Sequence, residues 1–136
     1  IIDAGACAVG LESTIIAVDG NGALRLLRPG PIDLGLLLEA GGTIEAPGQL
    51  ASHYAPTKPL RLNAVAAEDD EWLIGFADVL GGATLSPSGN LIEAAANLFD
   101  MLHQADASPC AKIAVAPVPG EGLGLAINDR LSRAAS

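Results

Sequence analysis

Short apolar runs predict strands in the first part of the chain. Residues 14–18 and 24–27 are rich in β-formers and flank Asp19-Gly20-Asn21-Gly22, whose residues tolerate positive φ angles. The pair therefore predicts a β-hairpin. The ladder should end at Arg28-Pro29-Gly30-Pro31, because proline cannot donate a backbone hydrogen bond. A short helix over residues 32–40 is expected next, ended by the glycine pair that follows it.

Strands and helices alternate in the second part of the chain. Apolar runs fit four strands, over residues 60–64, 72–76, 83–85 and 112–116. Two helices fit residues 91–105 and 123–135, each with one apolar stripe: Leu91, Ala95, Leu98 and Leu102, and then Leu123, Ile127, Leu131 and Ala134. Asn90 and Glu93 form a capping-box pattern at the start of the first helix. This alternation predicts the α/β class, a small, mostly parallel sheet with flanking helices in a Rossmann-like layered sandwich.

A proline-rich segment separates the two parts. Residues 46–59 contain three prolines and one glycine, which predicts an ordered, extended and semi-rigid linker. The chain is therefore expected to divide into a β-rich segment over 1–45, this linker, and an α/β domain over 60–136. It opens at Ile1 rather than at a methionine, which indicates part of a longer protein.

Composition and charge narrow the possible functions. Half of the 136 residues are hydrophobic but only 3% are aromatic, so Leu, Ile, Val and Ala must form the core. A net charge of −9 argues against nucleic-acid binding, which requires clustered Lys and Arg. Cys7 and Cys110 lack metal-type spacing and are expected to be reduced, as in a cytoplasmic protein. No apolar run has the length of a membrane span, and nothing marks export.

Three places in the first part carry candidate chemistry. Residues 10–14 place the Glu12 carboxylate and the Ser13 and Thr14 hydroxyls at the mouth of a strand, where they could meet a polar ligand or form an ordinary turn. Arg28 could hold a phosphate or carboxylate with its planar fork, or be an exposed solubilising residue. His53-Tyr54, in the linker, should dock either on the chain itself or over a ligand.

The α/β domain carries weaker signals. Residues 120–124 are glycine-rich, but a dinucleotide loop would need its third glycine at Leu125, so close packing is favoured and an anion site stays open. The acidic run 68–71 is expected to be a solvated loop. Residues 128–130 should make a capping or interdomain polar contact. No nucleophile with its base and orienting partner can be assembled from residues 60–136.

Taken together, several motifs resemble the long, two-domain form of the threonylcarbamoyl-AMP synthase family. They lie in the family's order, over nearly the whole chain: Val9-Gly10-Leu11-Glu12-Ser13-Thr14-Ile15-Ile16, Leu27-Arg28-Pro29-Gly30, Ala46-Pro47-Gly48, His53-Tyr54-Ala55-Pro56, Leu85-Ser86-Pro87-Ser88-Gly89, Glu93-Ala94-Ala95-Ala96-Asn97-Leu98-Phe99, and residues 121–131. The resemblance implies that residues 1–45 are the tail of a YrdC-like catalytic domain. It also implies that residues 60–136 are the accessory domain.

The resemblance further implies an activity and site residues. The family makes threonylcarbamoyl-AMP and pyrophosphate from L-threonine, bicarbonate and ATP, the first step of threonylcarbamoyladenosine modification of tRNA. By resemblance, Ser13 would contact threonine and Arg28 the ATP phosphates, while Tyr54, with His53 beside it, would reach ATP from the linker. Mg²⁺ would accompany ATP, with ligands outside this chain. The catalytic domain would precede the chain in cis, and the chain alone would be inactive.

Two other functions stay open from the sequence. The chain could be a non-catalytic α/β module that senses a nucleotide or contacts a protein. A Rossmann-type reductase is a weaker alternative, because the glycine spacing fails.

Overall fold

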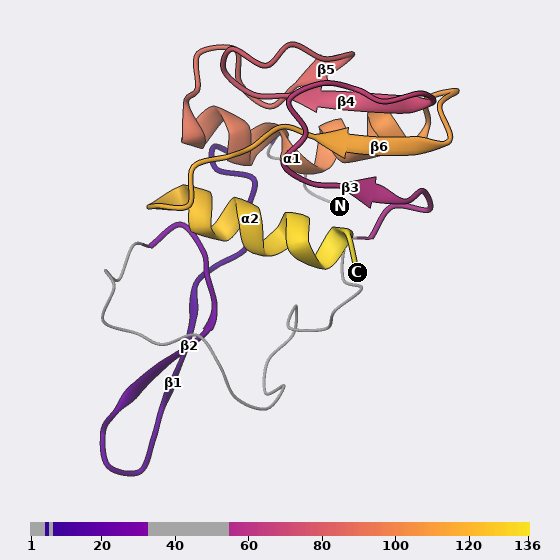
Figure 1. The fold of residues 1–136 in the computed structure, drawn as a ribbon. Coiled ribbons are helices and arrows are strands. Elements are labelled where there is room, and N and C mark those ends of the chain that lie inside the picture. The colour runs from indigo at the N-terminus through magenta and orange to yellow at the C-terminus, as the bar shows by residue number, and fades with distance from the viewer. Residues whose placement is uncertain (1–4, 6, 33–54) are drawn as a thin grey trace.

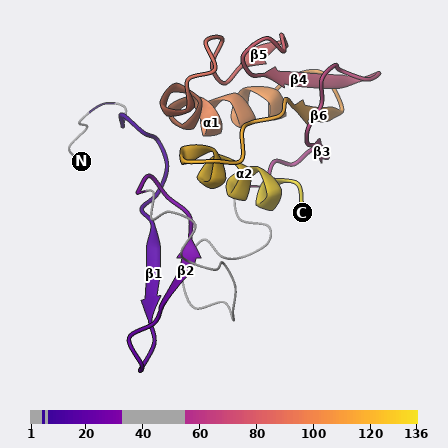
Figure 2. The ribbon, with the colours of Figure 1, turned by 60° about the vertical axis from the view of Figure 1, so that its left-hand side comes forward.

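The computed structural model describes residue 5 and residues 7–32 and 55–136 (Figure 1). Near the start, β1 (Ile15–Val18) and β2 (Leu24–Arg28) form the predicted antiparallel hairpin. The turn closes through the Gly22 amide, which donates to the Asp19 carbonyl at 2.8 Å, and Gly22 takes φ 83°. The hairpin projects away from the rest of the fold (Figures 1 and 2). The helix predicted over 32–40 lies almost wholly outside the described residues.

A four-stranded parallel sheet forms the centre of the second part. Its strands are β3 (Leu60–Arg61), β4 (Glu71–Gly75), β5 (Ala83–Thr84) and β6 (Lys112–Val115), in the spatial order β3-β6-β4-β5. The chain reaches β6 from β5 through α1 (Leu91–Asp106), and α2 (Leu123–Ala134) follows β6. The predicted α/β class with a mostly parallel sheet is confirmed.

The first strand of this sheet is shorter than predicted. The sequence suggested a strand over 60–64, but β3 ends at Arg61. Asn63 has φ 57°, in the left-handed region that an extended strand cannot contain. The chain nevertheless stays beside β6, since the Ala64 amide donates to the Val115 carbonyl at 2.9 Å.

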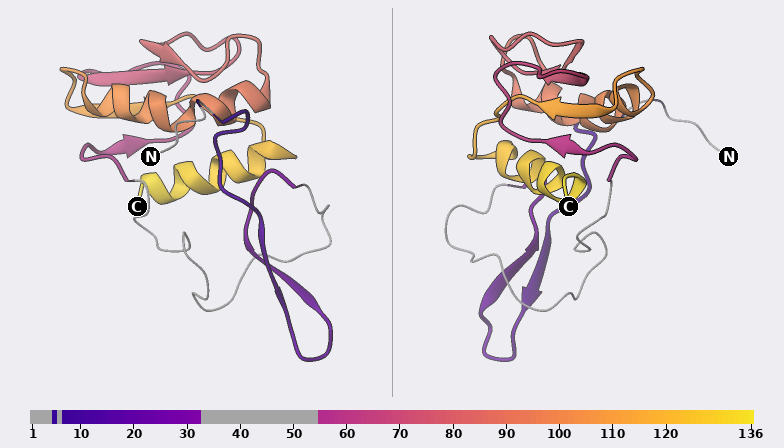
Figure 3. Two further views of the ribbon diagram at one scale, coloured as in Figure 1. Left: turned by 180° about the vertical axis from the view of Figure 1, so that it is seen from behind. Right: turned by 45° about the vertical axis from the view of Figure 1, so that its right-hand side comes forward.

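Both helices pack on one face of the sheet. Residues from the sheet and from both helices share one core: Ile74, Phe76, Ile113, Val115, Leu98, Leu102, Ile127 and Leu131. Leu73 and Ala114 point to the opposite face, where they pack with Ala64. The sheet therefore lies on one side of the two helices, as the turned views show (Figures 2 and 3).

The cap of α1 is more elaborate than the predicted capping box. The Asn90 side chain accepts from the amides of Ile92 and Glu93, at 2.8 and 3.2 Å, as expected. The Glu93 carboxylate does not complete the box by reaching the Asn90 amide. That amide donates to the fully buried Ser86 hydroxyl at 2.9 Å, and Ser86 in turn donates to Glu93 at 2.5 Å. Ser86 thus relays the interaction.

The segment before the hairpin rests directly on α1. Val9 and Leu11 pack against the main core. Between them, Gly10 has φ 66°, and a Cβ there would lie only 2.8 Å from the Ala96 Cα. The base of the hairpin is therefore held against the α/β domain by close backbone packing.

Two further observations concern the cysteines and the apolarity of the helices. Cys7 and Cys110 are both free thiols. In the described part of the chain, no helix combines the length and apolarity needed to cross a membrane.

Candidate functional site

The base of the hairpin brings Ser13 and Arg28 together. Ser13 precedes β1, and Arg28 ends β2 opposite Ile15. The Arg28 guanidinium donates from Nε and Nη2 to the Ser13 carbonyl, at 3.2 and 3.1 Å, and Nη2 lies 3.5 Å from the Ser13 hydroxyl. Arg28 is only 8% exposed, so the alternative of an exposed solubilising arginine is wrong. The two side chains that the sequence suggested for substrate contact are neighbours.

The next turn of the chain is fitted closely to this base. The Thr14 hydroxyl accepts from the Ile32 amide at 3.2 Å, so it is engaged in holding the turn. Gly30 lies against the same backbone, and a Cβ there would come within 2.6 Å of the Ser13 carbonyl carbon. Of the two hydroxyls at this strand mouth, Thr14 is used structurally, whereas Ser13 is exposed.

A buried arginine of α2 ties the hairpin base to the α/β domain. Arg130 is 0% exposed, and its Nε and Nη2 donate to the Glu12 carboxylate at 3.2 and 3.0 Å. Its Nη1 donates to the Pro29 carbonyl and to Asp129, the latter at 3.1 Å. Of residues 128–130, Arg130 thus makes a polar contact across to the hairpin base, whereas the Asn128 side chain donates to the Val118 and Pro119 carbonyls in the turn before α2. The partner of Arg130, Glu12, lies 118 residues away in sequence, which no local pattern could indicate.

The end of the linker is anchored at the C-terminus of α1. One Asp106 oxygen accepts from the Thr57 amide at 3.0 Å, the Thr57 hydroxyl at 2.8 Å and the Lys58 amide at 3.2 Å. The Lys58 ammonium donates to the Ala105 and Ser108 carbonyls at 3.1 and 2.7 Å, where a cation complements the helix dipole. Burial raises the pKa of Asp106, but the hydrogen bonds from Thr57 and Lys58 outweigh it and lower the pKa overall. No pattern in the sequence indicates this anchor.

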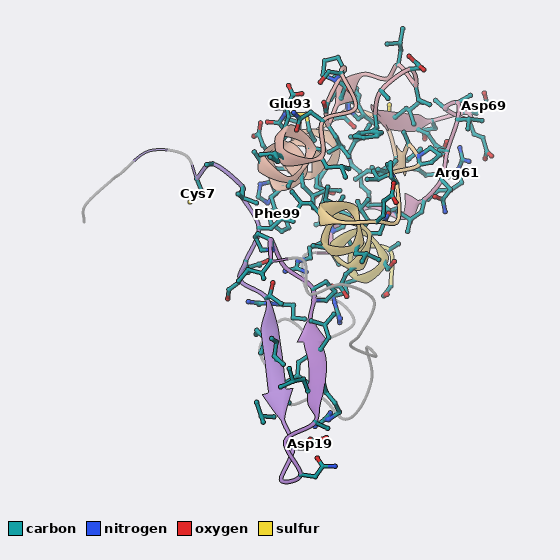
Figure 4. The ribbon with its side chains drawn as sticks, turned by 90° about the vertical axis from the view of Figure 1, so that its left-hand side faces the viewer. Cys7, Asp19, Arg61, Asp69, Glu93 and Phe99 are labelled. Carbon is teal, nitrogen blue, oxygen red and sulfur yellow. The ribbon has the colours of Figure 1, made fainter. Side chains whose placement is uncertain are left out.

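A cavity of about 410 Å³ lies between the hairpin base, the linker end and α1. Its lining residues are Glu12, Ala55, Pro56, Phe99, Leu102, His103 and Asp106. Phe99 lies on the side of α1 toward the hairpin, whose tip is marked by Asp19 (Figure 4). Ala55 and Pro56 directly follow His53 and Tyr54, which lie outside the described residues. The linker thus enters the described structure beside Glu12.

Comparison with known proteins identifies the family. The sequence profile described as "Threonylcarbamoyl-AMP synthase, C-terminal domain" matches residues 31–136. The chain belongs to this family. The threonylcarbamoyl-AMP synthase of Bacillus subtilis (strain 168) is 29% identical, in a match that covers 99% of this chain and 48% of the relative. The crystal structure of P. abyssi Sua5 complexed with L-threonine is similar with a TM-score of 0.76 and 25% identity, over 98% of this chain and 48% of that one.

This chain therefore spans about half the length of these synthase relatives. The resemblance proposed from the motifs is confirmed. The profile match begins at Pro31, after the hairpin, whereas the two relatives match almost the whole chain. The roles of Ser13, Arg28, His53 and Tyr54, and the division at residues 45/46 and 59/60, remain predictions.

The described residues offer no cluster for the Mg²⁺ that the synthase family implies. Within residues 5, 7–32 and 55–136 no three His, Cys, Asp or Glu side chains converge on one point. Glu12, the carboxylate nearest Ser13 in sequence, is paired with Arg130. The prediction of Mg²⁺ with ATP therefore rests on the resemblance, which places its ligands outside this chain.

One acidic residue expected in a solvated loop is buried instead. Glu71 begins β4, its side chain is 2% exposed, and it forms a bidentate pair with Arg61 at 2.8 and 2.6 Å. The hydrogen bond from Arg61 and that from the Glu68 amide lower the pKa of Glu71 to about 2. Its three acidic neighbours are exposed, as expected. The prediction failed at Glu71 because pairing with Arg61 makes burial of the carboxylate tolerable.

The glycine-rich turn before α2 serves close packing. A Cβ at Gly124 would collide with the Pro119 carbonyl, so only glycine fits there. The Gly124 amide donates to the Glu121 carbonyl at 2.9 Å within the turn. This confirms the packing interpretation at Gly124, and the anion site stays an untested alternative.

Proposed function

We propose that this chain contributes the accessory domain, the linker and one wall of the catalytic cleft to a threonylcarbamoyl-AMP synthase. The remaining walls belong to a catalytic domain that precedes the chain in the full-length protein. The enzyme makes threonylcarbamoyl-AMP from L-threonine, bicarbonate and ATP, as the first step of threonylcarbamoyladenosine modification of tRNA. Family membership supports the proposal, as does the synthase name of the Bacillus subtilis relative.

The pairing of Ser13 with Arg28 is the observation that carries the proposal. The threonine amine first captures the carboxyl unit of bicarbonate and water is lost. An oxygen of the resulting carbamate then attacks the α-phosphorus of ATP, and pyrophosphate leaves. A guanidinium beside a serine hydroxyl suits both reactants, because it neutralises phosphate charge while the hydroxyl hydrogen-bonds threonine or its carbamate. The similar P. abyssi structure is a complex with L-threonine.

The linker completes this arrangement. In the proposed enzyme, His53 and Tyr54 fold over the cleft, with Tyr54 reaching ATP. Closing the cleft excludes water, which would otherwise hydrolyse the mixed anhydride product. The Asp106 anchor supports this role, because it fixes the chain only a few residues beyond Tyr54. Mg²⁺ bound with ATP would offset phosphate charge, on ligands outside this chain.

The test is pyrophosphate release by the full-length protein, dependent on L-threonine, bicarbonate and ATP. Ser13→Ala should raise the KM for threonine about 10-fold, the loss of one hydrogen bond. Arg28→Gln should raise the KM for ATP about 10- to 100-fold, because hydrogen bonds to charged groups are stronger. Arg25→Gln is the matched control, since Arg25 pairs with Asp19 near the hairpin tip at 3.1 Å. It should change neither constant more than about two-fold.

Two results would contradict the proposal. One is a full-length protein that releases no pyrophosphate with these substrates. The other is kinetic constants of the Ser13 and Arg28 variants that match those of the Arg25 control. Calorimetry with ATP and L-threonine separates the alternative function. If the 136-residue chain binds ATP as tightly as the full-length protein does, it is a nucleotide-sensing module.

A further inference from the structure

Arg130 reaches both segments that carry the paired residues Ser13 and Arg28. Glu12 immediately precedes Ser13, and its carboxylate accepts two hydrogen bonds from Arg130, at 3.2 and 3.0 Å. Pro29 immediately follows Arg28, and its carbonyl accepts from the Nη1 atom of the same guanidinium. One planar group on α2 therefore bridges the entry to β1 and the exit from β2.

Burying the Arg130 guanidinium carries a large desolvation penalty, so this bridge forms only with well-placed hydrogen-bond acceptors. Arg130 is 0% exposed, and an arginine in such a place is tolerated only when its donors are paired. Asp129 supplies a further carboxylate at 3.1 Å and also accepts from Arg133, at 3.1 and 2.9 Å, which braces the arrangement on α2. The rigid fork of the guanidinium fixes distance and angle together, which a flexible ammonium would not.

We propose that Arg130 is a positioning residue for the substrate wall. By holding Glu12 and Pro29 at a fixed separation, it sets the spacing between Ser13 and Arg28, although it touches no substrate. The accessory domain then serves the reaction by shaping the cleft. This inference rests on the proposed function, because it assumes that Ser13 and Arg28 contact substrates.

The first test measures kinetics of the full-length protein. Arg130→Ala should raise the KM for threonine and for ATP by about 10-fold each, with a smaller change in kcat, because misplaced groups weaken binding of the substrates. Arg130→Lys should fall between Ala and the wild type, since an ammonium can reach Glu12 or Pro29 but cannot fork to both. Glu12→Gln, which removes charge but little volume, should raise the same constants.

A matched control separates positioning from mere stability. Arg61 also forms an ion pair with a buried carboxylate, Glu71, at 2.6 Å, but in Figure 4 it lies on the other side of α2 from the hairpin. Arg61→Ala should lower the melting temperature and leave both KM values within about two-fold of wild type, when they are assayed well below melting. If Arg130→Ala and Glu12→Gln behave like Arg61→Ala, Arg130 only stabilises the fold and the inference is wrong.

Hydrogen exchange gives a readout that does not depend on synthase activity. In the 136-residue chain, Arg130→Ala should speed amide exchange about 10-fold at residues 11–14 and at Arg28, Gly30 and Ile32, while leaving β4 and α1 protected. Unchanged exchange at the hairpin base would overturn the inference even if the enzyme is active. If Arg130→Ala speeds exchange at the hairpin base but the full-length protein has no synthase activity, the proposed function is contradicted. The structural link between Arg130 and the hairpin base would still hold.

Discussion

The buried pair of Glu71 and Arg61 makes the stability of this domain sensitive to acid. Glu71 Oε1 accepts from Arg61 Nε at 2.8 Å, and its Oε2 accepts from Arg61 Nη2 at 2.6 Å and from the Glu68 amide at 2.7 Å. These three bonds favour the charged form, so the pKa of Glu71 falls from 4.5 to about 2. Replacing Glu71 by Gln keeps the shape of the side chain but removes the charge that titrates.

The sign and size of the effect follow from this shift. Because the folded pKa is below the unfolded one, the carboxylate stabilises the native state above about pH 4.5, and this contribution disappears as the pH falls toward 2. A shift of this size corresponds to about 3 kcal/mol. The Arg61 side chain is 38% exposed, so solvent screens part of the interaction, and we expect about 1–2 kcal/mol.

The chain provides its own probe for the assay. Trp72 is the single tryptophan and follows Glu71 on β4. Urea unfolding followed by its fluorescence should give Glu71→Gln a lower free energy of unfolding at pH 7, and the gap from wild type should close by about pH 2. Glu68→Gln is the control, because Glu68 is 67% exposed and 3.7 Å from Arg61. Parallel curves for wild type and Glu71→Gln across this range would refute the reasoning.

Two further substitutions test the core and the hairpin base. Leu98→Ala should lower the free energy of unfolding by about 3–5 kcal/mol, because Leu98 is 0% exposed in the core that α1 shares with the sheet and α2. A decrease below about 1 kcal/mol, measured by urea unfolding, would mean that Leu98 does not lie in the core. Gly30→Ala should cost about 1–3 kcal/mol and speed amide exchange at Ser13 and Thr14, because its Cβ would press on their backbone; unchanged exchange there would show that this close approach does not exist.

Local patterns in the sequence predicted most of the elements of this fold. Helical spacing of apolar residues located α1 and α2, and the turn residues between two apolar runs located the hairpin. The predicted end of a strand was wrong where a single backbone angle ends the strand. Asn63 ends β3 early through its positive φ, which an asparagine permits but does not require. The role of Ser86 in the cap of α1 could not be predicted from the sequence either, because it depends on where the folded chain places this buried hydroxyl.

The sequence suggested candidate site residues but not their contacts. The motifs pointed to Ser13 and Arg28, whose roles stay predictions, and the structure adds that the two residues are in contact. Asp106 and Lys58 carried no signal, since their partners lie 47 to 50 residues away and their role exists only where the linker meets the end of α1. Pairing at such separations is set by packing of the whole domain, which residue spacing does not encode.

Arg130 shows how far a sequence can go toward such a contact. It lies three residues after Ile127 and four before Ala134, so helical spacing places it within the apolar stripe of α2. A charge on a buried face must have partners, because an unpaired guanidinium in the core would cost several kcal/mol. The sequence therefore implied that Arg130 has a hydrogen-bond acceptor. Only the fold, by bringing residues 12 and 29 to the same side of α2, supplies Glu12 and the Pro29 carbonyl. It follows that the structural effect of an Arg130 substitution should be measured first at the hairpin base and only then in α2 itself.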